Sequence, residues 1–276
     1  MKSNKKITEL VISGGGVRGI AFLAVIYELE QRDLLELTKV AGTSIGAFIG
    51  ACLVIGYTAK ELMNKLFYYD LKSLKDIDIQ NSLENKSFLK GNKVKRFFES
   101  FLEHKINPYI TLYELYHQTG IEYYATTCCL NTKSIEYLSY KTYPDLTLLQ
   151  CILMSTAIPG ILPPIEYSNK LYIDGGLLDN MPMCVLSENA VGIKSSSSNT
   201  TQDSFCGNNI NVLDYCKEII KMMYSQIKTG YETQNVIVVD TRDVTVTSFD
   251  ITIDQKYTLI QMAKHAVDSY LKIIIG

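Results

Sequence analysis

Residues 7–19, ITELVISGGGVRG, contain the pattern that decides the fold. A short run of β-favouring residues ends in three glycines, and apolar residues at helical spacing follow over residues 17–35. Residues 37–55 repeat this order, with a strand expected up to Thr43 and a helix from Ile45. Two strand–turn–helix units in succession favour right-handed crossovers. The sequence therefore predicts an α/β fold with a mostly parallel central sheet flanked by helices, whose sites form at the carboxyl ends of the strands.

The rest of the chain supplies further elements for the same sheet. Residues 58–118 are polar with helical spacing and predict a helical insertion. Strands are expected at residues 121–127, 135–140, 171–174, 191–194 and 236–239, and helices at residues 146–156, 211–226 and 255–273. Residues 195–209 are rich in Ser, Asn and Thr and predict a mobile polar loop. Residues 192–276 are short for an independent domain, so we expect them to complete the first one.

Composition excludes several classes of function. The 276 residues include 27 basic and 29 acidic side chains, a net charge of -2 that lacks the positive field of a nucleic-acid binder. Seven cysteines at irregular spacings form neither a disulfide framework nor a zinc motif. We therefore expect no nucleic-acid partner and no zinc site. The chain also has no complete P-loop, calcium-loop or dinucleotide motif, so we expect no other metal and no cofactor.

The N-terminal stretch and the longest apolar stretch bear on location. Glu9 and Arg18 interrupt any apolar run of the kind that a signal peptide needs. Residues 45–56 are non-polar but too short to cross a bilayer, so a buried helix is predicted there. These features favour a cytoplasmic protein, while a secreted or injected effector stays open.

Ser44 is the candidate nucleophile. Gly42-Thr43-Ser44-Ile45-Gly46 fits the G-x-S-x-G pattern, in which a strained turn between strand and helix lifts a serine hydroxyl above the sheet. Gly42 and Gly46 would avoid clashes in that turn. A helix-capping or packing turn could give the same five letters.

Asp174 is the candidate general base for Ser44. It ends an expected strand and precedes Gly175 and Gly176, and a parallel-sheet fold would place it beside the Ser44 turn. The histidines fall within helical patterns, at His104, His117 and His265. A Ser-Asp dyad is therefore favoured over a Ser-His-Asp triad, although Asp-Gly-Gly is also an ordinary turn sequence.

The first glycine cluster is a candidate oxyanion hole. Gly14, Gly15 and Gly16 lead into a helix, where backbone N–H groups can stabilise a developing negative charge. Arg18 could brace this loop or meet an anionic lipid headgroup. Gly19 completes a G-x-G-x-x-G pattern.

This same pattern is the dinucleotide fingerprint, which makes an NAD- or FAD-binding oxidoreductase the alternative. Such a site expects an acidic residue at the end of the second strand, about 20 positions on. Residues 41–44, Ala-Gly-Thr-Ser, occupy that place. The alternative therefore lacks its ribose anchor.

The three motifs around Gly14, Ser44 and Asp174, in this order, resemble those of the patatin-like phospholipase family. Other stretches resemble the family too, including Ser155-Thr156-Ala157-Ile158-Pro159 and Asn180-x-Pro182. The resemblance implies an α/β fold and metal-independent hydrolysis of fatty-acyl esters of phospholipids or other lipids. It also implies Ser44 as nucleophile, Asp174 as base and the glycines at 14, 15 and 16 as oxyanion hole.

The resemblance covers residues 7–191, interpreted as the catalytic part of the domain. A lipid substrate would require contact with a membrane, which an amphipathic helix around Phe97 and Phe98 could make. Apolar stripes at this spacing mostly pack on the core, and this is the favoured interpretation of the helix. A non-catalytic lipid- or membrane-binding protein with the same fold is the third interpretation. Neither the lipid headgroup nor an activating protein partner can be read from these residues.

Overall fold

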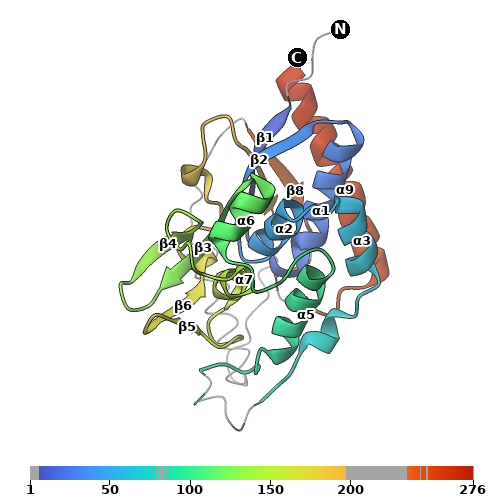
Figure 1. The fold of residues 1–276 in the computed structure, drawn as a ribbon. Coiled ribbons are helices and arrows are strands. Elements are labelled where there is room, and N and C mark those ends of the chain that lie inside the picture. Colours follow the sequence, from blue (N-terminus) through green and yellow to red (C-terminus); the bar gives the residue numbers. More distant parts are fainter. Residues whose placement is uncertain are drawn as a thin grey trace.

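The fold is built on an eight-stranded sheet. The computed structural model describes residues 6–78, 80, 84, 86–196, 235–242, 244–246 and 248–275. Its strands are β1 (Ile7–Ile12), β2 (Leu35–Thr43), β3 (Glu122–Cys129), β4 (Ser134–Leu138), β5 (Ile165–Tyr167), β6 (Lys170–Asp174), β7 (Val191–Ser196) and β8 (Val236–Asp240). They follow the order β5-β6-β3-β2-β1-β7-β8, and β4 pairs with β3 (Figure 1).

Parallel pairing dominates the centre of the sheet. β3, β2, β1, β7 and β8 pair with one another in parallel. β4 and β6 pair antiparallel with β3, and β5 pairs antiparallel with β6. The predicted α/β fold with a mostly parallel sheet is thus confirmed, with an antiparallel region at one side.

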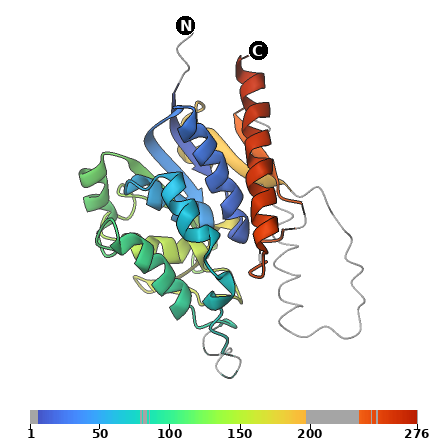
Figure 2. The same ribbon diagram turned by 90° about the vertical axis from the view of Figure 1, so that its right-hand side faces the viewer.

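Helices cover the sheet and form most of the core. They are α1 (Gly19–Gln31), α2 (Ile45–Val54), α3 (Ala59–Phe67), α5 (Asn92–Glu103), α6 (Leu112–Thr119), α7 (Leu148–Thr156) and α9 (Ile253–Ile275). Short 3-10 turns are η1 (Gly16–Arg18), η2 (Leu71–Leu74), η3 (Gly175–Leu177) and η4 (Met183–Val185). α9 packs along α1, so the C-terminal helix joins the layer begun by the N-terminal one (Figure 2).

The stretch predicted as a helical insertion contains α3, η2, α5 and most of α6. The apolar face of α5 lies in the core, because Phe97, Phe98 and Phe101 are buried and their rings surround that of Phe48. α2 is buried as well, at every position after Ile45. The core interpretation of both helices is therefore confirmed. Within the described residues, no helix combines the length and the apolar character that a bilayer crossing requires.

The C-terminal part agrees with the sequence where it is described. β7, β8 and α9 occupy the expected places. β7 extends through Ser196, so the start of the predicted mobile loop is strand instead. Strand pairing with β8 accounts for this, because residues 195 and 196 pair with residues 239 and 240. The remainder of that loop and the helix expected at 211–226 lie outside the described residues.

Candidate active site

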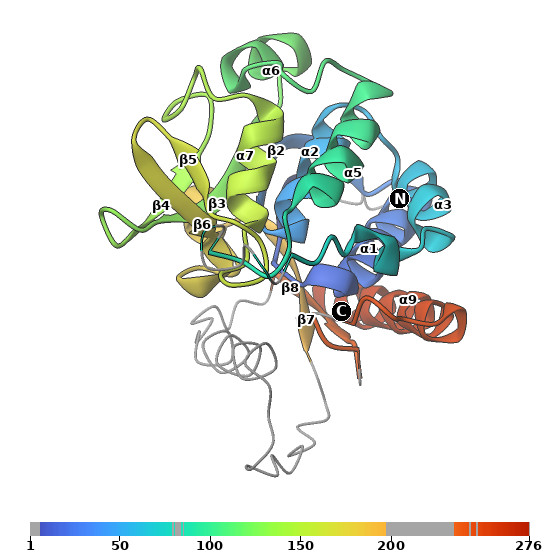
Figure 3. The ribbon, with the colours of Figure 1, turned by 90° about the horizontal axis from the view of Figure 1, so that it is seen from below.

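The strands that flank β3 bring the two candidate catalytic residues together. β4 pairs with residues 125–129 of β3, β2 with residues 122–126 and β6 with residues 127–129. A strand has two edges, and β4 overlaps both of the other strands, so β2 and β6 must share the opposite edge. Figure 3 looks onto this end of the sheet from below.

The ends of β2 and β6 meet at adjacent residues of β3. Thr43 lies opposite Thr126, and Asp174 lies opposite Thr127. The sequence argument expected a parallel sheet to bring Asp174 to Ser44, and in this respect it was wrong. β6 runs antiparallel to β3, so its carboxyl end approaches that of β2 from the other direction. The acid and the serine therefore follow two strand ends that point toward each other.

The turn that carries Ser44, here called the serine elbow (residues 42–46), is tight. Ser44 has φ +55° and ψ -124°, a backbone conformation that residues other than glycine rarely adopt. A Cβ on Gly46 would lie 2.2 Å from the carbonyl oxygen of Ile12, and one on Gly42 would lie 2.4 Å from the backbone of Gly46. Both glycines are thus required by close backbone approach, as the G-x-S-x-G pattern predicts.

Ser155 holds the elbow from α7. The Ser44 N–H donates to the Ser155 Oγ at 2.9 Å, and that hydroxyl donates to the Thr126 carbonyl at 2.7 Å. Ser155 is fully buried. The stretch around Ser155 stands out in the sequence, but no role is predicted for it there. Ser44 and Ser155 are 111 positions apart, so their hydrogen bond leaves no local pattern.

The turn after β6, here called the acid turn (residues 174–176), fixes the carboxyl of Asp174. This residue is 0% exposed. Its N–H donates to the carbonyl of Ala157 at 2.9 Å, and its Oδ1 accepts the N–H of Gly176 at 2.7 Å. Gly175 begins η3 and packs against Thr126 of β3. The carboxyl is therefore buried and oriented by its own turn.

The segment between β1 and α1, here called the glycine turn (residues 14–18), presents backbone donors. Bonds within the protein run from Gly14 N to Asn180 O (3.0 Å), from Val17 N to Val246 O (3.1 Å) and from Arg18 N to Gly15 O (3.0 Å). Among the described residues, the N–H groups of Gly15 and Gly16 find no acceptor. Gly15 and Gly16 are therefore the candidate oxyanion donors, whereas the Gly14 N–H is already bonded. Gly19 is the first residue of α1.

A C-terminal segment braces the glycine turn. Gly16 has φ +53°, and a Cβ there would lie 2.1 Å from the carbonyl oxygen of Val246. The guanidinium of Arg18 donates from Nε to the Val244 carbonyl at 2.7 Å and from Nη1 to the Ser195 hydroxyl at 3.4 Å. Burial lowers the pKa of Arg18. These contacts fit the bracing interpretation of Arg18. Val244 lies 226 positions from Arg18, so no local pattern predicts this partner segment.

Other candidate groups are poorly placed for nucleophilic chemistry at this site. His104, His117 and His265 are exposed, whereas Ser44 is 7% exposed. Burial and the negative charge of Asp174 raise the pKa of the Cys128 thiol to about 12, so this thiol stays protonated near neutral pH. The dinucleotide alternative fails at the carboxyl end of β2, where residues 41–43 are Ala-Gly-Thr and the acidic residue of the strand, Glu36, lies near its start.

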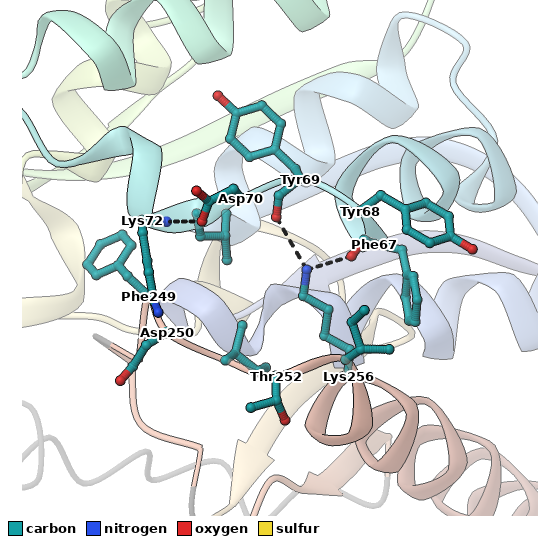
Figure 4. A pocket seen from close by; sticks show the side chains of 12 residues that line it. Phe67, Tyr68, Tyr69, Asp70, Lys72, Phe249, Asp250, Thr252 and Lys256 are labelled. Carbon is teal, nitrogen blue, oxygen red and sulfur yellow. Dashed lines mark hydrogen bonds between the residues drawn. The ribbon is translucent and has the colours of Figure 1, made fainter.

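An open pocket of about 450 Å³ lies between the α3–η2 segment and the start of α9 (Figure 4). Lys256 is 4% exposed there, and its ammonium donates to the carbonyls of Phe67 at 2.6 Å and of Leu66 and Tyr69 at 3.4 Å. Burial lowers the pKa of this lysine. No residue of the serine elbow, the acid turn or the glycine turn lines this pocket.

In the described part of the chain, no group of three or more His, Cys, Asp or Glu residues could hold a metal ion.

Comparison with known proteins gives consistent matches. A family model described as patatin-like phospholipase matches residues 10–186. A probable lipid hydrolase of Invertebrate iridescent virus 6 is 31% identical over 180 residues, which cover 63% of this chain and 61% of that protein. Lysophospholipase NTE1 of Meyerozyma guilliermondii is 27% identical over 183 residues, which cover 63% of this chain and 11% of that protein.

A solved structure supports the same fold. VipD from Legionella pneumophila aligns with 97% of this chain and 67% of its own, with a TM-score of 0.67. At 17% sequence identity this similarity concerns the fold alone. The chain matches less than two thirds of the length of either of the two sequence relatives named above.

Proposed function

Because this chain belongs to the patatin-like phospholipase family, we propose that it is a lipid acyl hydrolase of the phospholipase A type. Its substrates are fatty-acyl esters of phospholipids, and Ser44 and Asp174 act as a catalytic dyad through an acyl-enzyme intermediate. One observation carries the assignment: β2 and β6 end opposite Thr126 and Thr127, adjacent residues on one edge of β3.

In the first half-reaction, the Asp174 carboxylate accepts the hydroxyl proton of Ser44 while the Ser44 Oγ attacks the acyl carbonyl carbon. The N–H groups of Gly15 and Gly16 stabilise the oxyanion that forms. The tetrahedral intermediate collapses, Asp174 returns the proton to the leaving alcohol oxygen, and the lysolipid departs. The fatty acid remains esterified to Ser44.

In the second half-reaction, water takes the place of the alcohol. Asp174 accepts a proton from the water while the water oxygen attacks the acyl carbonyl carbon. The same glycine N–H groups stabilise the second oxyanion. Collapse returns the proton to Ser44 and releases the fatty acid. Burial of both side chains supports this cycle, because a water-poor site strengthens the electrostatic interactions that it uses.

The lipid substrate places the working enzyme at a membrane surface. We propose peripheral contact with cytoplasmic membranes, with residues 7–191 supplying the catalytic part and residues 192–276 completing the same domain. The contacts from Val244 and Val246 to the glycine turn support one domain, because residues beyond 191 brace the proposed oxyanion hole.

Fatty-acid release from mixed phospholipid vesicles tests the proposal. The wild type should release fatty acid with a chelator present, and Ser44→Ala should lose about 10³-fold or more in rate, since only binding and the oxyanion donors remain. Ser100→Ala on α5 is the matched control, because Ser100 is exposed and its hydroxyl donates to the Phe97 carbonyl of the same helix. Equal release by wild type and Ser44→Ala would reject Ser44, and no release by a folded wild type would favour a non-catalytic lipid binder.

A further inference from the structure

Asn180 contacts the glycine turn through both its backbone and its side chain. Its carbonyl accepts the Gly14 N–H at 3.0 Å, and its Nδ2 donates to the Gly14 carbonyl at 3.3 Å. Two hydrogen bonds to the same residue fix both of the peptide planes that Gly14 joins. The next N–H groups along the chain are those of Gly15 and Gly16, the proposed oxyanion donors.

The residue before Asn180 contacts the serine elbow. The Thr43 hydroxyl, one position before Ser44, donates to the Asp179 carbonyl at 3.1 Å. The Asp179 N–H in turn donates to the Gly175 carbonyl in η3 at 3.0 Å. Residues 179 and 180 therefore connect all three turns of the site: the acid turn, the serine elbow and the glycine turn.

Packing around Gly14 shows that the Asn180 side chain has a defined place. A Cβ on Gly14 would lie 2.3 Å from the Asn180 Oδ1 and 3.5 Å from the Ser44 Cβ. The amide and the Ser44 side chain thus flank the same glycine. The Asn180 Oδ1 is buried and accepts no hydrogen bond from the described residues. An asparagine needed only for a turn would not have its amide fitted against the neighbouring catalytic segment.

We infer that Asn180 is a positioning residue, which holds the glycine turn against Ser44 so that the N–H groups of Gly15 and Gly16 face the oxyanion. The inference rests on the proposed function of the site. A small displacement of such donors weakens transition-state stabilisation far more than substrate binding. Loss of Asn180 should therefore lower kcat with little change in KM.

The kinetic test compares Asn180→Ala, Asn180→Asp and Asn107→Ala. Asn180→Ala should lower kcat by about 10- to 100-fold. Asn180→Asp keeps the size of the side chain but removes the amide donor and adds negative charge, so it should lower kcat at least as far. Asn107 is the control, because it is exposed and its Oδ1 accepts the local N–H of Tyr109. A rise in KM at unchanged kcat would contradict the positioning role.

A double-mutant cycle separates positioning from general loss of stability. Gly14→Ala alone should lower kcat about as far as Asn180→Ala, because the new Cβ displaces the amide. In the Asn180→Ala background the same methyl finds space, and Ser44 Cβ is then an ordinary contact. The double variant should lose no more activity than either single variant. Additive losses would overturn the inference.

Amide hydrogen exchange provides a readout that does not depend on hydrolysis. Exchange at residues 13–17 should be faster in Asn180→Ala and in Asn180→Asp than in the wild type, while exchange in α9 stays unchanged. If the wild type releases no fatty acid, the proposed function fails, while faster exchange still supports the contact. If the wild type is active and either folded variant keeps full kcat and wild-type exchange, the inference alone fails.

Discussion

The site at the strand ends and the pocket beside α9 differ in how they use polar groups. At the strand ends, Ser44 and Asp174 are buried, and glycines allow three turns to approach one another. In the pocket, the buried Lys256 ammonium is already bonded to the carbonyls at the end of α3 (Figure 4). The open pocket has a structural lysine, whereas the tight site has the groups that acyl transfer needs. On the proposed function, catalysis takes place at the strand ends and not in this pocket.

The two regions are nevertheless connected. The chain between β8 and α9 first passes the glycine turn, where the Val244 and Val246 carbonyls accept hydrogen bonds. It then lines the pocket with Phe249 and Ile251 before Lys256 joins α9 to α3. The comparison predicts large catalytic losses at the strand ends, smaller ones at the connection and only stability losses in the pocket.

Asp174→Asn should give the largest effect after loss of the nucleophile. The amide keeps the shape of the carboxyl but does not accept the serine proton, so kcat/KM should fall by about 10³-fold or more. Fatty-acid release measures this loss, and thermal unfolding checks the fold. Full activity of Asp174→Asn would exclude Asp174 as the general base and favour one of the histidines in that role.

Arg18→Met should give an intermediate effect, since it keeps the length of the side chain but loses the bonds to Val244 and Ser195. With the glycine turn held less firmly, kcat should fall by about 10-fold. Steady-state kinetics of fatty-acid release give kcat and KM separately. A large rise in KM for anionic lipids alone, at constant kcat, would favour a role of Arg18 in headgroup binding instead.

Lys256→Met should reduce stability and leave catalysis nearly unchanged. The carbonyls of Leu66, Phe67 and Tyr69 lose a charged donor, which should cost about 1–3 kcal/mol of unfolding free energy. Denaturant unfolding measures this cost, and kcat should remain within about twofold because the ammonium contacts no group of the site. A loss of kcat in folded protein comparable to that of Arg18→Met would remove the distinction between the two regions.

Glu9→Gln should have the smallest effect, a change in how the unfolding free energy depends on pH. Burial acts to raise the pKa of Glu9, but hydrogen bonds from Ser187 and Lys39 outweigh it, so the pKa lies below its usual value. The unfolded state therefore binds the proton more readily. The stabilisation, about 1 kcal/mol, is present above the unfolded pKa near 4.3 and is lost as pH falls through the folded pKa.

Unfolding measured between pH 3 and pH 7 checks this prediction. The wild type should lose stability relative to Glu9→Gln as the pH falls, and hydrolysis at pH 7 should be equal. A difference in stability that does not change with pH would contradict the assigned protonation. Loss of kcat would show that the amino end of β1 acts on the site at the other end of the sheet.

Local patterns were enough to predict most of the described elements and to single out the two candidate catalytic residues. The glycine turn, the serine elbow and the acid turn each combine a strand end with glycines, so they are visible in short windows around Gly14, Ser44 and Asp174. Alternating or continuous apolar runs located the described strands to within a few residues, except β5, whose three residues are too few to show a pattern. The roles of these residues in catalysis stay a prediction.

Contacts between distant segments could not be predicted. β6 pairs antiparallel with residues 127–129 of β3, and no residue of β6 encodes that partner or that direction by itself. Ser155, Asn180 and Lys256 use single polar atoms to reach backbone groups 111 to 190 residues away in sequence. Such bonds depend on tertiary packing, whereas a turn depends on its own few residues.

Mass spectrometry of the acyl-enzyme tests the central claim most directly. The protein is mixed with a phospholipid, quenched in acid within the first turnovers and digested. We predict that the peptide containing Ser44 gains the mass of one acyl group, and that Ser44→Ala gains none. Fatty acid released by folded wild type with an acyl group on another residue, such as a cysteine, would contradict the account.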